Sequence, residues 1–291
     1  MLLALAALVS SLPGWQLEAV QENAVPPSVM HAAAHVRIAI VDTGADLSVP
    51  ELAGRRPLAY DTRTHTADVQ DPSGHGTFVA SVAAAFGGDA HLILVKAGSS
   101  SGAFTDQAEA DGIRYAIRHG ARIVNLSIGG PTTSRVERAA IRFAVDSGAL
   151  VVTAAGNDHG MGNPVEYPAA LVQPVGSDGS GGTGLVVAAS DRGQRASFSG
   201  SGSWISLAAP GVGVYGALRG GGHGYGNGTS FAAPQVSGAA ALVWAADPSL
   251  TAQDVAYILE RSASGHGRWT PELGYGVIDV GAAVRAAMAL H

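Results

Sequence analysis

The sequence predicts an α/β fold of three layers, with a mainly parallel central β-sheet and helices on both faces. Short apolar segments rich in β-branched residues alternate with longer segments of helical periodicity. The chain has 40 glycines in 291 residues, which suits the many tight turns that such an alternation needs. Hydrophobic residues make up 47% and charged residues 14%, so the chain can bury one large core.

The strand segments are short, apolar and bounded by glycine or polar residues. The first of them, residues 36–41, is the apolar run Val36-Arg37-Ile38-Ala39-Ile40-Val41 and ends at Asp42-Thr43-Gly44. The other expected strands are residues 91–95, 122–128, 150–155, 185–189 and 204–208. Strands that alternate with helices form parallel sheets whose two faces are covered by those helices.

The helix segments carry recognisable start and stop signals. Apolar residues recur at helical spacing after His75, and Gly120 and Gly148 follow two further apolar-periodic segments. Thr251 with Asp254 three residues later is a capping-box pattern. The expected helices are a turn at residues 15–20, a helix starting near His75, residues 105–119, 134–147 and 230–246, a helix from Thr251, and a short alanine-rich helix at the end.

The chain is expected to form a single domain over residues 15–291, with residues 1–14 as an extension. Leu2 to Val9 is an apolar run followed by Ser10 and Ser11, as in the core of a signal peptide. A signal peptide also has a basic start, yet the first basic side chain is Arg37. Both a secreted or extracytoplasmic and a cytoplasmic location therefore stay open.

Composition excludes several functional classes. The net charge of −6 is spread along the chain and gives no basic patch for nucleic acid. The absence of cysteine excludes disulfides and thiolate catalysis. No apolar run approaches the roughly 20 residues needed to span a membrane. Residues 211–216 match GxGxxG, but Gly220-Gly221-Gly222 follow closely, so no helix opens there to bind a dinucleotide.

Four polar residues suggest nucleophilic catalysis. Asp42 ends a buried strand, His75 lies between Gly74 and Gly76 at a helix start, and Ser230 follows a glycine-rich turn at the start of a long apolar helix. A serine hydroxyl needs a base to take its proton, and the base needs a carboxylate to orient it. Asn157, on a glycine-flanked turn, can donate to the oxyanion that forms. Taken singly, Asp42 can be a turn cap and His75 a packing residue.

These motifs resemble those of the subtilisin-like serine proteases, or subtilases. The matching segments are Asp42-Thr43-Gly44, His75-Gly76-Thr77, Ala154-Ala155-Gly156-Asn157 and the run from Gly228 to Pro234, and the resemblance covers residues 15–290. It implies a subtilisin-like fold and a serine endopeptidase that works through an acyl-enzyme. Ser230 would be the nucleophile, His75 the general base, Asp42 its orienting carboxylate and Asn157 an oxyanion-hole donor.

The resemblance also implies that a protein or peptide substrate binds as an added strand. The expected edges are Ser127, Ile128 and Gly129 on one side and residues 101–104, with Ser101 and Gly102, on the other. The pocket for the residue before the cleaved bond would be walled by Ala154, Ala155 and Gly156. Glu166 lies before Tyr167-Pro168 at the same pocket; it either attracts a Lys or Arg side chain there or points to solvent.

No cofactor is expected to be required, and no metal ligand set is predicted. The family's tight calcium site uses a loop inserted in the region of the His75 helix, whereas here that helix runs to Phe86 and directly on to the next strand. Glu51 occupies a position that the family uses for calcium, and without partner ligands we expect it to be a surface group. Other calcium sites are left open.

Two alternatives to a broad endopeptidase remain from sequence. One is a narrow processing protease that matures one partner peptide. The other is a catalytically silent binding protein with the same fold, although the presence of Asp42, His75, Asn157 and Ser230 together argues against it. The sequence does not determine the oligomeric state.

Overall fold

The computed structural model describes residues 15–99 and 101–290, so the signal-like segment 1–14 lies outside the described residues. An eight-stranded sheet runs in the order β2-β3-β1-β4-β5-β6-β7, with β8 also paired to β6. All neighbouring strands are parallel except β6 and β7. The strands are β1 (Arg37–Asp42), β2 (Leu58–Asp61), β3 (His91–Lys96), β4 (Ile123–Leu126), β5 (Leu150–Ala154), β6 (Leu185–Asp191), β7 (Gln194–Arg195) and β8 (Leu207–Pro210).

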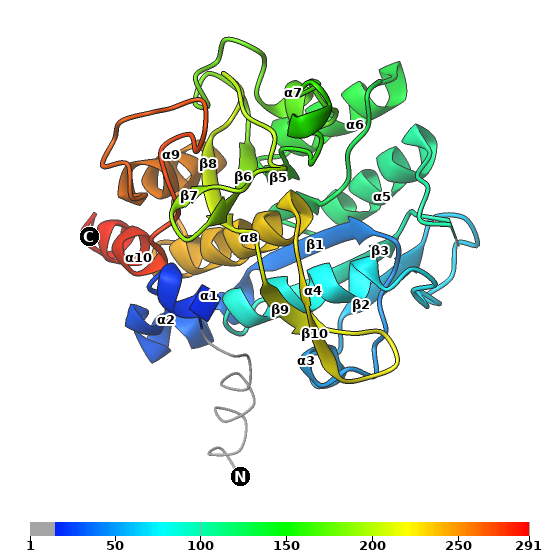
Figure 1. Cartoon of the computed structure of the whole chain (residues 1–291). Coiled ribbons are helices and arrows are strands. Elements are labelled where there is room, and N and C mark those ends of the chain that lie inside the picture. Colours follow the sequence, from blue (N-terminus) through cyan, green and yellow to red (C-terminus); the bar gives the residue numbers. More distant parts are fainter. Residues whose placement is uncertain (1–14, 100, 291) are drawn as a thin grey trace.

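Helices cover both faces of this sheet, which confirms the predicted three layers (Figure 1). On one face α4 (His75–Phe86) packs against α8 (Thr229–Ala246), and on the other α5 (Asp106–Arg118) packs against α6 (Arg135–Asp146). The helices α9 (Ala252–Ser262) and α10 (Val280–Met288) flank α8. Short helices complete the described chain: α1 (Trp15–Ala19), η2 (Glu22–Ala24), α2 (Pro27–Ala32), η3 (Ala33–His35), α3 (Pro50–Ala53), η4 (His159–Met161) and α7 (Ala169–Val172).

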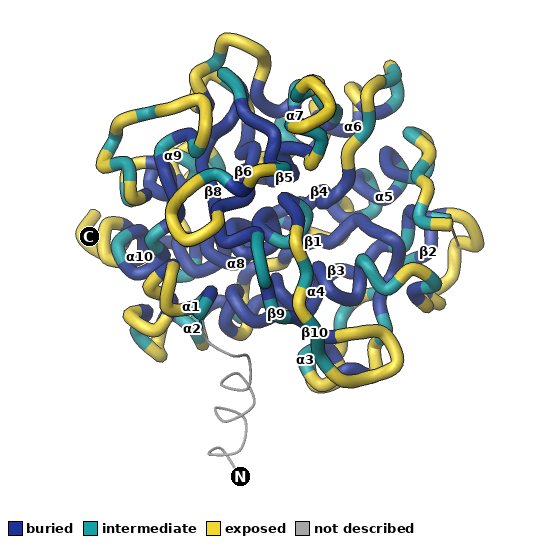
Figure 2. Tube along the Cα trace, in the orientation of Figure 1, coloured by how far each residue is buried: buried dark blue, intermediate teal, exposed yellow. Residues whose placement is uncertain are grey.

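Helix α8 is the centre of the molecule. It is buried on nearly all sides, and Figure 2 shows it dark blue among exposed surface loops. Gly238 allows α8 to approach α4 closely, because a Cβ there would collide with the backbone of Phe86 and Gly87. Apolar packing around the whole helix circumference therefore fixes where α8 begins, and with it the position of Ser230.

The predicted helix starts match the structure closely where the sequence contains a capping residue. Thr105 and Ser134 accept backbone N–H groups at the starts of α5 and α6, and Thr251 and Asp254 form the expected capping box. The first helical turn, α1, also packs on the domain as expected: Trp15 Nε1 donates to Gly213 O, and the buried Gln16 amide pairs with the backbone of Tyr215.

Several short elements were missed in the sequence and one strand was misplaced. Strand β2 lies in a segment for which no strand was expected, and the strand expected at residues 204–208 is shifted to Leu207–Pro210. The GxGxxG segment leads into a two-stranded antiparallel hairpin of β9 (Val214–Ala217) and β10 (His223–Gly226). No helix of the described residues is long and apolar enough to cross a membrane.

Candidate active site

The site lies where the strand order changes direction. Strand β1 lies between β3 and β4, and its last residue, Asp42, is at the carboxyl edge of the sheet. Ser127 follows β4 at the same edge, and Asn157 follows β5. Open α/β sheets bind ligands at such a switch point, because the loops diverge there and leave a crevice.

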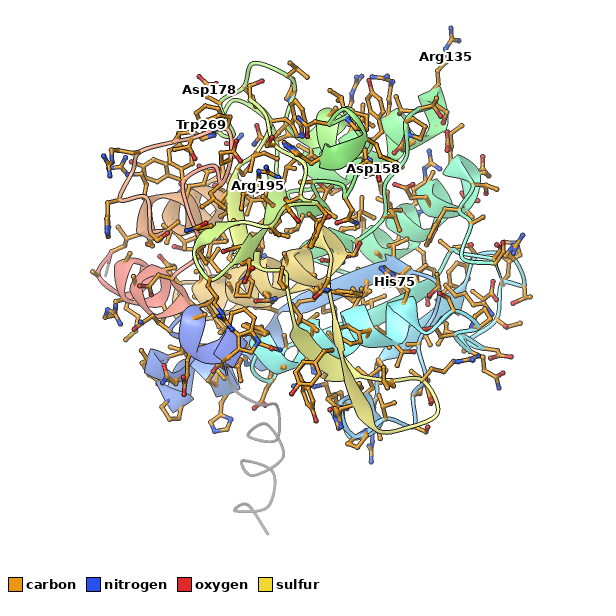
Figure 3. The ribbon with its side chains drawn as sticks, in the orientation of Figure 1. His75, Arg135, Asp158, Asp178, Arg195 and Trp269 are labelled. Atoms are coloured by element: carbon orange, nitrogen blue, oxygen red, sulfur yellow. The ribbon has the colours of Figure 1, made fainter. Side chains whose placement is uncertain are left out.

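His75 and Asp42 are in hydrogen-bond contact. His75 begins α4 (Figure 3), and its Nδ1 lies 2.8 Å from Asp42 Oδ1. The same Oδ1 accepts the Thr43 backbone N–H at 2.7 Å, while Oδ2 is buried without a partner. Gly76 makes this approach possible, since a Cβ there would overlap the backbone oxygen of Gly44.

A second buried carboxylate supports this contact. Asp71 Oδ1 accepts from the Thr43 hydroxyl and from the backbone of Ser73 and Gly74, and its Oδ2 accepts both donors of Thr77. The Thr43 hydroxyl in turn accepts the Gly76 N–H at 2.9 Å. Sequence reasoning missed Asp71. Its position before Pro72 and four residues before His75 was the available signal, since Asp commonly caps such turns.

The charges around His75 raise its pKa. Burial alone would lower it, but the neighbouring Asp42 carboxylate, its hydrogen bond and the more distant Asp71 together outweigh that effect. Burial would likewise raise the pKa of Asp71, but the hydrogen bonds from Thr77, Gly74 and Thr43 lower it instead. The site thus places two carboxylates, those of Asp42 and Asp71, near a histidine whose side chain is 29% exposed.

Ser230 is the second residue of α8, and a proline shapes its surroundings. Pro234 lies in the second turn of the helix, not the first as its sequence position suggested. Because proline has no N–H, the carbonyl of Ser230 loses its usual helical partner. The Ser127 hydroxyl replaces it, donating to Ser230 O at 2.9 Å. Helix α8 is therefore tied to the end of β4 at the residue that carries the hydroxyl.

The Ser230 hydroxyl itself donates to the Ser127 carbonyl oxygen at 3.1 Å. Among the described residues, the Ser230 hydroxyl makes no hydrogen bond to His75. The centroid of the neighbouring Phe231 ring lies 5.6 Å from that of the His75 ring. Catalytic hydrogen bonds in free enzymes are often long or misaligned and shorten when substrate binds.

Asn157 is oriented by the residue before the serine. Its Oδ1 accepts both the backbone N–H and the hydroxyl of Thr229, at 2.9 and 3.1 Å. The N–H groups of Nδ2 are left as donors on the other side of the amide. A further hydrogen-bond chain, also missed in the sequence, leads from Ser237 on α8 through Asn125 to the Ser127 hydroxyl.

The two segments expected to pair with a substrate strand differ in their backbone hydrogen bonds. Among the described residues, no hydrogen bond uses the backbone of Ile128 or Gly129, and pairing resumes only at Gly130 with Tyr167. Residues 101–104 instead form a tight turn, closed by Ser99 N–H to Ala103 O at 2.8 Å and by Gly102 N–H to Ser99 O. The Gly102 N–H and the Ala103 carbonyl are therefore already hydrogen-bonded within the turn.

Glu166 lies between two glycines of the expected pocket. A Cβ on Gly129 or on Gly156 would overlap its carboxylate oxygens, so the side chain lies against both segments. Ala154 and Ala155, which precede Gly156, are buried. Burial and the nearby Asp158 raise the pKa of Glu166, although a backbone N–H of Asn157 opposes them. Glu166 is half-buried, not turned out into solvent.

The region expected to lack calcium is filled by protein groups. Helix α4 runs unbroken to Phe86, and β3 starts at His91. The Arg55 guanidinium donates to the carbonyls of Ala84, Gly88 and Ala90 at the end of that helix. Glu51, expected to be a surface group, is instead largely buried and paired with His223 of β10. The Arg55 guanidinium thus occupies the three carbonyls at the end of α4, so that helix end does not fit a calcium ion, whereas Glu51 Oε2 is buried without a hydrogen-bond partner.

Known proteins match the chain over most of its length. A family model described as the subtilase family matches residues 33–276. Subtilisin E of Bacillus subtilis is 35% identical over 88% of this chain and 67% of its own length, and subtilisin of Bacillus pumilus is 35% identical over 88% and 93%. A cold-adapted subtilisin-like serine proteinase of known structure has a TM-score of 0.72 at 28% identity, covering 84% of this chain and 89% of its own.

Proposed function

The chain belongs to the subtilase family and is a serine endopeptidase, and on this basis we propose that Asp42, His75 and Ser230 are its catalytic triad, with Asn157 in the oxyanion hole. The observation that carries the proposal is the hydrogen bond between His75 and the buried Asp42, next to a serine at a helix start. The same three groups in the same order were expected from the sequence.

In the proposed mechanism, His75 takes the Ser230 proton through Nε2 as the hydroxyl attacks the substrate carbonyl. Asp42, buried and bonded to Nδ1, stabilises the imidazolium that forms. The Asn157 amide and the Ser230 backbone N–H, at the positive end of α8, donate hydrogen bonds to the oxyanion. His75 then protonates the leaving amine, and water hydrolyses the acyl-enzyme by the same steps in reverse.

Substitutions test these roles through hydrolysis of a peptide substrate. Ser230→Ala and His75→Ala should each lower kcat by about 10⁶-fold, the loss known from a subtilisin. Asn157→Ala should cost less, on the order of 10²–10³-fold, also as in a subtilisin, because it removes one donor only. Retention of wild-type kcat by Ser230→Ala would contradict the triad. Circular dichroism checks that each variant is folded.

We also propose that a peptide substrate pairs with Ser127, Ile128 and Gly129. This is supported by the backbone of Ile128 and Gly129, which no hydrogen bond uses within the described residues. Counting from the cleaved bond toward the substrate's N-terminus, P1 then enters the pocket beside Glu166. A half-buried carboxylate in contact with Gly129 and Gly156 favours a Lys or Arg side chain at P1. A narrow specificity for one partner peptide would follow from such pockets.

A panel of peptides that differ only at P1 tests the role of Glu166. Lys and Arg should give a higher kcat/KM than Leu and Phe, and Glu166→Gln should reduce that preference by roughly tenfold or more. The Asp158→Asn variant is the matched control, since Asp158 acts on Glu166 only through its charge. Equal or better cleavage after Phe and Leu, with no loss in Glu166→Gln, would exclude this role.

The proposal includes neither a required cofactor nor a calcium ion at the end of α4, because the Arg55 guanidinium occupies the three carbonyls there. An extracytoplasmic location is also proposed, supported by the subtilisin relatives. Fractionation of the source cells tests it, and recovery of the protein only with cytoplasmic markers would contradict it.

A further inference from the structure

A pocket of about 250 Å³ lies between α9, the start of β5 and the segment that leads into β6. Leu150 lines it and is the first residue of β5, whereas Asn157 of the candidate active site follows the other end of that strand. The five residues of β5 span roughly 13 Å. Helix α9 lies at the left of Figure 1, and His75 lies right of the centre of Figure 3, which has the same orientation. The pocket is therefore separate from the candidate active site.

Glu260 on α9 lines this pocket with a buried carboxyl group. The residue is 4% exposed. Within residues 15–99 and 101–290, its carboxyl takes part in no ion pair and accepts no hydrogen bond. Burial alone raises the pKa of Glu260 to about 8. The protein thus holds a carboxyl at the pocket without supplying a cation or a donor for it.

Gln173 brings a second buried acceptor to the same pocket. It is 2% exposed, and its Nε2 donates to Gly184 O at 2.6 Å. Its Oε1 is buried without a hydrogen-bond partner. The amide lies against Gly182, since a Cβ on that glycine would be 2.5 Å from Oε1. Buried oxygens that lack donors are costly to a folded protein, so a ligand that brings donors gains affinity from them.

Small side chains on α9 give the pocket its apolar part. Ala252, Ala256 and Glu260 are spaced by four residues, so they form one row along the helix. Leu150, which is 1% exposed, adds a larger apolar side chain. Tyr257 is 61% exposed and is the other titratable group among the lining residues, which include no Lys, Arg or His. A ligand can therefore place an apolar chain beside the alanines and a polar end at Glu260.

The chemistry of the two acceptors selects the ligand. A primary ammonium group has three N–H donors and no acceptor, and its charge compensates a carboxylate. A metal ion fits less well, because no three His, Asp or Glu side chains in the described part of the chain could hold one together. The pocket is also smaller than those that bind drug-sized molecules. From the pocket and its two acceptors we propose that Glu260 and Gln173 form a binding site for a small primary alkylammonium ion.

Three small probes test this site on the full chain, followed by protein NMR in the Ser230→Ala background to prevent self-digestion. The probes are n-butylammonium, neutral butyramide of similar size, and tetramethylammonium, a cation without N–H donors. Butylammonium should bind roughly tenfold or more tightly than either of the others, because it alone brings both the charge and the donors. No saturable binding of butylammonium, or equal affinity for all three probes, would overturn the proposal.

Binding should become tighter as the pH rises. With a pKa of about 8, the carboxyl of Glu260 in the free protein is about one tenth ionised at pH 7 and about nine tenths ionised at pH 9. An alkylammonium stays charged over this range, since its pKa is about 10.4, as in lysine. Because the cation favours the ionised carboxylate, its affinity should rise about tenfold between these two pH values. An affinity that stays constant or falls would contradict the role of Glu260.

Variants locate the bound ion. Glu260→Gln should weaken butylammonium binding by roughly tenfold or more and remove its pH dependence. Gln173→Met, which removes the amide acceptor at similar volume, should weaken it several-fold. Glu22→Gln alters another buried carboxyl with a raised pKa, outside this pocket, and should bind like the parent. Parent-like affinity in a folded Glu260→Gln variant would overturn the site, and where the variant does not fold, the comparison of the three probes decides.

Discussion

The pKa of His75 is set by residues on three different segments. Asp42 ends β1, His75 begins α4, and Asp71 lies in the loop between β2 and α4. Their charges overcome burial and raise the pKa of the imidazole. Because only the neutral imidazole can act as a base, activity should appear as pH rises through this raised pKa. The acid limb of kcat/KM should therefore lie above the ordinary histidine value of about 6.5.

Replacing Asp71 should shift the acid limb of the kcat/KM profile against pH. In Asp71→Asn the charge that helps to raise the His75 pKa is lost, so the acid limb should shift to lower pH. The variant should also lose about 1–3 kcal/mol of stability, because an amide cannot accept all the N–H and O–H donors around it. Profiles of kcat/KM against pH measure the shift. Asp46→Asn, which alters a half-buried carboxylate nearby, is the control. An acid limb that does not move in Asp71→Asn would contradict the electrostatic role.

At the scale of elements, the candidate site lies at helix ends: His75 is at the start of α4, and Ser230 is at the start of α8. Helix α4 is held at its start by the contacts of Asp71 and at its end by Arg55, which spans three carbonyl groups. Helix α8 is held at its start by Ser127 and Asn157, through Ser230 O and the donors of Thr229. The positions of His75 and Ser230, the proposed catalytic side chains, thus depend on polar contacts at helix ends as well as on apolar packing.

Arg55 should contribute measurably to the stability of this arrangement. Arg55→Met leaves the carbonyls at the end of α4 without their donor, and we expect a loss of about 3 kcal/mol. Urea unfolding measures it, with the exposed neighbour Arg56→Met as the control. A calcium chelator should leave the wild-type Tm unchanged. A drop in wild-type Tm on chelation as large as that caused by Arg55→Met would instead assign this helix end to calcium.

Elements with local signals were predictable, and those fixed by distant pairing were not. Thr105, Ser134 and Thr251 mark helix starts through their own side chains, so their helices were found from sequence. Strand β2 is exposed on one edge and has little apolar pattern, and the β9–β10 hairpin contains several glycines. These strands depend on partners far along the chain, which a local pattern does not reveal.

At the scale of the molecule, the fold brings together residues that lie far apart in sequence. Asp42 and His75 are 33 positions apart, and Ser127 and Ser230 are 103 apart, yet each pair is in hydrogen-bond contact. The motifs led to the proposed triad because their residue types and order are distinctive. They could not predict Asp71, Ser127 and Asn125 as support, or Glu260 and Gln173 as the lining of one pocket, since these roles arise only when helices and strands pack.

The central claim is that Ser230 is a nucleophile activated by His75. Its most direct test is labelling of the folded protein with a fluorophosphonate, followed by peptide mapping by mass spectrometry. The account predicts one label per chain, located on Ser230, absent in Ser230→Ala and strongly slowed in His75→Ala. A folded wild-type protein that remains unlabelled, or a label on another residue that persists in Ser230→Ala, would contradict it.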